Sequence, residues 1–168
     1  GTIPPERIAG LAKLHGYDCA AIADRDGLYG AIKFYKSATE CGVKPVIAAE
    51  LTSPEGGAPL FLVAKDLSGY ASIARLITRR KLHPSEFDRE KETADEAKRG
   101  NIFVLSSSPE TIYRLVKERA PKSSLFIRLS GIKAEDASAE KAKTLFDLPF
   151  VFAPLFAFEK EDDLSTHR

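Results

Sequence analysis

Residues 19–51 read CAAIADRDGLYGAIKFYKSATECGVKPVIAAEL, and this stretch decides the fold class. Residues 19–23 form a short apolar run that closes on an aspartate, which is typical of a buried strand. Residues 28–41 carry apolar side chains at helical spacing, and Gly42 follows where such a helix would end. Residues 45–51 form a second apolar run. The order strand, helix, strand predicts a βαβ unit.

The same alternation continues outward in both directions. Further strands are predicted over 60–64, 101–105, 125–129 and 150–158, and further helices over 4–15, 69–80, 108–119, 134–146 and 161–168. The polar, charge-rich residues 79–99 predict a surface excursion made of loop and helix. This order of elements predicts an α/β fold with a mostly parallel sheet, either open or closed into a barrel.

The composition is that of a single globular domain without a strong charge. The 25 basic and 24 acidic residues leave a net charge of +1, which excludes a strongly basic nucleic-acid binder and an acidic tail protein. No apolar run reaches the roughly 18 residues that span a bilayer, and no leader opens the chain, so we expect a cytoplasmic protein without membrane contact. Cys19 and Cys41 are predicted to be free, buried thiols. The sequence has no methionine, so we expect it to be a fragment of a longer chain.

Functional side chains of a parallel α/β fold collect at the carboxyl ends of its strands. Two of the predicted strand ends offer carboxylates, Asp24 and Glu50. The other ends offer hydroxyls, a lysine and apolar groups, at Lys65, Asp66, 106–108, Ser130 and 154–157. We therefore expect any site to lie along this edge of the sheet.

Several motifs in the chain carry a family resemblance. They are IADRDGLYG (22–30), FY (34–35), GVKPVI (42–47), EL (50–51) and LFLVAK (60–65). Together they resemble the PHP domain of bacterial C-family DNA polymerases, which are the replicative DNA polymerase III alpha subunit and its error-prone relatives. The sequence DRDGLYG at 24–30 resembles the error-prone polymerases more closely than the replicative ones. The resemblance covers nearly the whole chain, is dense up to residue 80 and is thin from there to residue 146.

The resemblance implies a PHP-like, distorted (βα)7 barrel whose first strand would precede Gly1, as one domain over 1–168. In active members of the family, His, Asp and Glu side chains hold two or three divalent metals that hydrolyse phosphoesters, in some polymerases as 3′–5′ proofreading. The parent chain would be a DNA-directed DNA polymerase of replication or translesion repair. The implied partners are the remainder of that polymerase chain, DNA, and other replication or repair subunits.

By this resemblance, the chain keeps two of the family's metal-ligand positions, Asp24 and Glu50. Arg25 stands where the family has histidine, and a guanidinium has no lone pair for a metal. Leu155 and Ala157 stand at the positions of an Asp-x-His pair, and the opening His-x-His motif is absent from the sequence. We therefore expect no cofactor. The alternative is a weak site for Mg²⁺, Mn²⁺ or Zn²⁺ at the two remaining carboxylates.

Arg25 and its neighbours are predicted to replace the metal site structurally. The guanidinium could pair with Glu50, Asp24 or Asp26 and neutralise acids that the metals once neutralised. Asp26 and Gly27 are also explained as a tight turn that enters the next helix. The three possible partners of Arg25 stay open at this point.

The stretch 150–158 alternates phenylalanines with smaller side chains, which is the period of a strand. Leu155 and Ala157 fall on the smaller face, so the former site would be filled by apolar groups. We expect a buried strand here. The alternative is a surface that packs against the rest of a polymerase.

Arg79, Arg80 and Lys81 end a predicted helix, where cations complement the helix dipole. A contact with a phosphate backbone is the functional alternative for this cluster. The expected function of the whole chain is that of a structural and interaction module with a degenerate metal site. The alternatives are an active metal-dependent phosphoesterase or 3′–5′ proofreading exonuclease, and a free-standing α/β protein that binds a small molecule.

Overall fold

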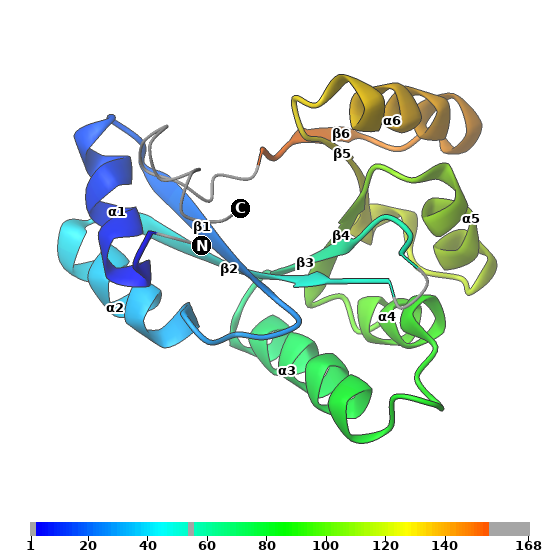
Figure 1. The fold of residues 1–168 in the computed structure, drawn as a ribbon, viewed down its shortest axis with the longest axis horizontal. Helices are drawn as coiled ribbons and strands as arrows, with labels where there is room; N and C mark the ends of the chain where they lie inside the picture. The colour runs from blue at the N-terminus through cyan, green and yellow to red at the C-terminus, as the bar shows by residue number, and fades with distance from the viewer. Residues whose placement is uncertain (1–2, 54–55, 155–168) are drawn as a thin grey trace. The chain divides into compact units, whose positions relative to one another are not determined.

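The computed structural model describes residues 3–53 and 56–154 (Figure 1). Within them, six α-helices, one short 3₁₀ helix and six strands follow one another as α1 (Pro5–Leu14), β1 (Cys19–Arg25), α2 (Ala31–Cys41), β2 (Lys44–Leu51), β3 (Leu60–Ala64), α3 (Leu67–Leu82), α4 (Arg89–Ala97), β4 (Ile102–Ser106), α5 (Pro109–Lys117), η1 (Lys122–Ser124), β5 (Leu125–Leu129), α6 (Lys133–Phe146) and β6 (Phe150–Phe152). The predicted α/β fold is confirmed. None of the helices in these ranges is long and apolar enough to cross a membrane.

The strands form one sheet in the order β1-β2-β3-β4-β5-β6. β4 and β5 pair in parallel, as do β5 and β6, whereas β3 is antiparallel to both β2 and β4. The prediction of a mostly parallel sheet is therefore wrong at β3. Only residues 52–59 connect β2 to β3, and a parallel crossover needs a dozen or more residues. The seven-stranded barrel stays a prediction, because the described residues supply six strands.

Because β3 runs antiparallel to β2 and β4, its carboxyl end lies beside the amino ends of these two strands. Lys65 follows β3 and donates its N–H to the carbonyl of Asn101, which precedes β4, at 3.0 Å. Asp66 caps α3, because its carboxylate accepts the N–H of Gly69 at 2.8 Å. Lys65 and Asp66 therefore do not lie near the carboxyl end of β2, where Glu50 is found.

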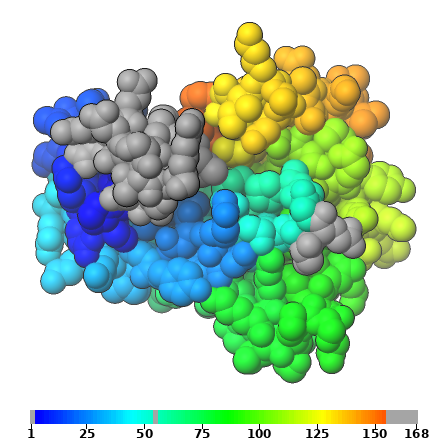
Figure 2. Space-filling model, viewed as in Figure 1, coloured from blue at the N-terminus to red at the C-terminus, as the bar shows by residue number. Residues whose placement is uncertain are grey.

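The chain divides into two compact units. Among the described residues, the small unit comprises residues 3–22, Tyr29–Ile47 and Pro154, and the large unit comprises Ala23–Leu28, residues 48–53 and residues 56–153. In the small unit α1 packs on α2, as Figures 1 and 2 show, around a core of Ala9, Ile22, Phe34 and Ala38. A Cβ at Gly30 would lie 2.7 Å from the end of the Ile22 side chain and 2.8 Å from the ring of Pro5, so these side chains would have to shift to admit a larger residue.

The large unit holds the main core. Its strands and helices bury aliphatic side chains that include Leu60, Leu62, Ile73, Leu76, Ile102, Val104, Ile112, Leu115 and Ile127. Ser108 caps α5 as expected, since its hydroxyl accepts the N–H of Thr111 at 3.2 Å. Within the predicted surface excursion, α4 buries one of its faces through Thr93, Ala94 and Ala97. This polar helix is therefore part of the packed structure.

Two side chains predicted to be buried are exposed. Cys19, a free thiol, is exposed, and Cys41, also free, is half-buried. Phe152 is 68% exposed. Cys19 opens β1 and Phe152 ends β6, and these are the edge strands of the sheet as described, so fewer neighbours cover them. Leu155 and Ala157 lie outside the described residues.

Candidate functional site

Arg25, Asp26 and Glu50 meet where β1 and β2 end, inside the large unit. The N–H of Asp26 donates to the carbonyl of Glu50 at 2.8 Å, which fixes the end of β1 beside β2. Arg25 Nε lies 3.3 Å from Glu50 Oε1, and the two side chains are 74% and 12% exposed. A largely exposed guanidinium therefore covers a carboxylate that is nearly buried. Of the three partners considered for Arg25, this geometry selects Glu50.

Asp26 is the centre of a second set of polar contacts. Its φ of 48° is left-handed, a conformation that aspartate tolerates better than most residues. Its carboxylate accepts the N–H of Thr52 at 3.0 Å and the hydroxyl of Thr52 at 2.7 Å, and it pairs with Arg80 Nη1 at 2.9 Å. Arg80 also donates to the carbonyl of Thr52 at 2.6 Å and to its hydroxyl at 2.8 Å. We call Asp26, Thr52 and Arg80 the Asp26 network; it joins the ends of β1 and β2 to α3.

Two of the three cations for which a phosphate contact is the alternative form ion pairs inside the large unit. Arg80 belongs to the Asp26 network, and Arg79 Nε lies 2.7 Å from Glu92. Lys81 is exposed. A phosphate would have to compete with carboxylates for the two arginines, and the contact at Arg79, Arg80 and Lys81 stays an untested alternative.

The donor set at the strand ends does not fit a metal cluster. Among residues 3–53 and 56–154, no three His, Cys, Asp or Glu side chains lie close enough together to hold a metal ion. Of the two carboxylates that the resemblance assigns as ligands, Glu50 has the guanidinium of Arg25 against it. A divalent cation placed there would be repelled by that fixed positive charge.

A polar groove of about 790 Å³ lies along the same edge of the large unit. It is lined by residues that follow β2 and β4 and by the first turns of α4, α5 and α6, among them Ser53, Ala58, Ser107, Ser108, Thr111, Ala134 and Ser138. Its ionisable lining consists of Glu86, Asp88, Glu90, Glu110 and Glu135 against Arg89 and Arg114. The carboxylates of the lining outnumber its two arginines.

Sequence reasoning missed two buried arginines beside this groove. Arg89 lies 2.6 Å from Glu90 and donates to the carbonyl of Ala58 at 2.9 Å. Arg128 donates to the carbonyl of Ala153 at 2.8 Å and pairs with Glu135 at 3.1 Å. No spacing signal marks such residues, because most of their partners come from distant segments.

Comparison with models of known protein families identifies the family of this chain. Residues 1–147 match the model of the PHP domain. The chain belongs to the PHP family. The resemblance that the motifs predicted is confirmed.

Segments of this PHP domain are similar to error-prone DNA polymerases. Over 67 residues it is 45% identical to the error-prone DNA polymerase of Symbiobacterium thermophilum, covering 40% of this chain and 6% of the polymerase. Over 87 residues it is 36% identical to the enzyme of Corynebacterium diphtheriae, covering 51% of this chain and 8% of the polymerase. The matched part is thus less than a tenth of the length of these relatives.

A solved structure shares the fold of the PHP domain. It belongs to a candidate metal-dependent phosphoesterase from Bifidobacterium adolescentis and superposes with a TM-score of 0.56, at 12% identity, over 99% of this chain and 90% of the other. An identity this low shows a common fold and does not carry the activity across.

Ion pairs link α3 to α4 in the PHP domain. Arg75 lies 2.8 Å from Glu96, and Arg99 lies 3.2 Å from the same carboxylate. Burial acts to raise the pKa of Glu96, but hydrogen bonds from Arg75 and Ser72 and the nearby positive charges outweigh it, so the pKa lies below its ordinary value.

Glu96→Gln is expected to remove a pH-dependent part of the stability. A carboxyl with a lowered pKa stabilises the fold above its unfolded-state pKa, and this contribution is lost as the pH falls through the folded-state value. The difference in free energy of unfolding between wild type and variant should therefore shrink between about pH 6 and pH 3. Urea unfolding across that range measures it, and a difference that stays constant or grows on acidification would contradict the assignment.

Proposed function

We propose that this PHP domain is a structural and interaction module of an error-prone type DNA polymerase whose metal site has been lost. The observation that carries the proposal is the ion pair of Arg25 with Glu50 at 3.3 Å, because the family resemblance assigns metal ligands to Glu50 and to the position of Arg25. In place of bound cations, a side-chain cation neutralises the buried acid.

The Asp26 network supports a structural role for the same strand ends. Thr52 and Arg80 hold Asp26 through side-chain contacts that need no metal. In the longer chain, the domain would complete a distorted (βα)7 barrel, pack against the polymerase body in the cytoplasm, and help to position DNA or partner subunits during replication or translesion repair. The similarity to segments of error-prone DNA polymerases supports this placement.

The test is hydrolysis by the chain itself. The 168-residue chain is incubated with Mn²⁺ and either a 5′-labelled single-stranded oligonucleotide or p-nitrophenyl phosphate. We expect wild type to release no more product than Glu50→Ala, because a divalent ion would lack ligands at the strand ends. Cleavage by wild type that Glu50→Ala abolishes would instead assign a metal-dependent phosphoesterase or proofreading exonuclease. Cleavage that is equal in both proteins marks a contaminating nuclease and leaves the expected result standing.

A further inference from the structure

The carboxylates of α4 are largely taken up by arginines of the neighbouring helix. Glu92 lies 2.7 Å from Arg79, and Glu96 lies 2.8 Å from Arg75, both on α3. On the exposed side of α4, Asp95 is paired with Lys98 at 2.7 Å. The negative charge of this polar helix is therefore neutralised within the large unit.

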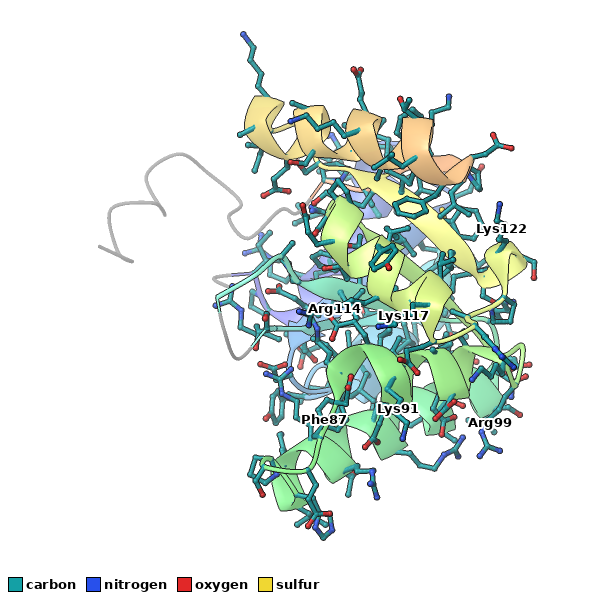
Figure 3. The ribbon with its side chains drawn as sticks, turned by 90° about the vertical axis from the view of Figure 1, so that its right-hand side faces the viewer. Phe87, Lys91, Arg99, Arg114, Lys117 and Lys122 are labelled. Atoms are coloured by element: carbon teal, nitrogen blue, oxygen red, sulfur yellow. The ribbon has the colours of Figure 1, made fainter. Side chains whose placement is uncertain are left out.

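Exposed cations also lie in the same region. Lys91, Arg99, Arg114, Lys117 and Lys122 come from α4, the residues just after it, α5 and η1, and all five are exposed. Figure 3 shows Arg114 and Lys117 on the outer side of α5, with Lys91 on α4 beside them. We call these five residues the α4–α5 basic face.

Most cations of this face take part in no ion pair within residues 3–53 and 56–154, although carboxylates line the same hollows as Lys91 and Arg114. Lys91, Arg114 and Lys117 have no carboxylate within ion-pair distance in the part of the chain that the structure describes. Arg99 shares Glu96 at 3.2 Å, and Lys122 donates only to the carbonyl of Phe146, at 3.3 Å. In a chain whose net charge is +1, the α4–α5 basic face brings five cations together on neighbouring elements.

We propose that the α4–α5 basic face binds the phosphate backbone of a DNA strand. Unpaired arginines and lysines gain affinity for such a polyanion by releasing its counterions. Tyr113 is 57% exposed and lies one turn before Lys117 on α5, so its ring can stack on a base of a single strand. The proposal rests on the proposed function only for the expectation of DNA as a partner. It places the contact away from Arg79 and Arg80.

Binding of labelled DNA to the 168-residue chain tests the proposal. The probes are fluorescein-labelled oligo(dT) and a duplex of equal length, each followed by anisotropy at several NaCl concentrations. The double variant Arg114→Gln/Lys117→Gln should weaken oligo(dT) binding about tenfold and make its log–log salt dependence shallower by about 1.4. Tyr113→Ala should weaken oligo(dT) binding about fivefold and leave duplex binding unchanged.

Lys36→Gln/Lys44→Gln is the matched control. It removes the same charge at two exposed positions of the small unit, and both DNA affinities should stay at the wild-type value. The proposal is overturned if neither DNA binds in a salt-dependent way, or if the control weakens binding as much as the double variant. It is also overturned if polyglutamate displaces the DNA at equal charge concentration, which would assign the face to an acidic protein. These outcomes leave the hydrolysis test unaffected.

Discussion

Gly69→Ala is expected to destabilise the chain by about 3 kcal/mol, because the large unit has no room for a methyl group at this position. A Cβ at residue 69 would lie 2.2 Å from the carbonyl oxygen of Asn101 and 3.1 Å from Cα of Ala64. Both neighbours are backbone atoms and cannot move aside as a side-chain end could. The first turn of α3 would have to lift from β3 and β4, which also breaks the cap that Asp66 forms.

The matched control for this change is Gly10→Ala in α1. Nothing lies within 4 Å of a Cβ built at Gly10, and alanine is the better helix former. Urea unfolding followed by circular dichroism should therefore show Gly10→Ala at or above wild-type stability, and Gly69→Ala far below it. A loss of less than about 1 kcal/mol in Gly69→Ala would contradict the close approach of α3 to the sheet.

Asp26→Ala is expected to cost about 3 kcal/mol, since it removes several interactions at once. The variant loses both hydrogen bonds from Thr52 and leaves Arg80, whose side chain is 18% exposed, without its carboxylate. Alanine also tolerates the left-handed φ of 48° less well than aspartate does. The midpoint of thermal or urea unfolding measures the loss.

Two further variants separate the causes. Asp26→Asn keeps an oxygen that can accept from Thr52 and tolerates the same backbone conformation, so its loss should be smaller, about 1–2 kcal/mol. Asp95→Ala removes one partner of an exposed pair with Lys98 and should change stability by less than about 0.5 kcal/mol. If Asp26→Ala were as mild as Asp95→Ala, the Asp26 network would not hold the strand ends together.

The elements of this chain were predictable where local sequence sets them. Gly42 ends α2 with a φ of 70°, and Ser108 caps α5, so neighbouring residues alone determine these boundaries. The direction of β3 was not predictable from its apolar run, because it depends on which strands lie beside it. The exposure of Cys19 and Phe152 has the same origin, since an apolar run does not reveal that its strand is an edge.

In the candidate site, too, neighbouring residues made some features predictable, and features that depend on distant residues were not. The motif at 24–30 drew attention to Arg25 and left three carboxylates as partners, and geometry selects one. Thr52 and Arg80 could not be assigned to Asp26, because each comes from a distant segment and no spacing links them. The α4–α5 basic face was hidden because α4 mixes both signs of charge in sequence. Only the structure places its acids against Arg75 and Arg79.

The central claim is that Arg25, and not a metal ion, neutralises Glu50. Titration of the chain with Mn²⁺, followed by the electron paramagnetic resonance signal of free Mn²⁺, tests this claim directly. We expect no bound Mn²⁺ below about 1 mM in wild type and tighter binding in Arg25→Ala, where the repelling charge is gone. One or more Mn²⁺ bound per wild-type chain at about 10 μM or below, and released by Glu50→Gln, would contradict the claim.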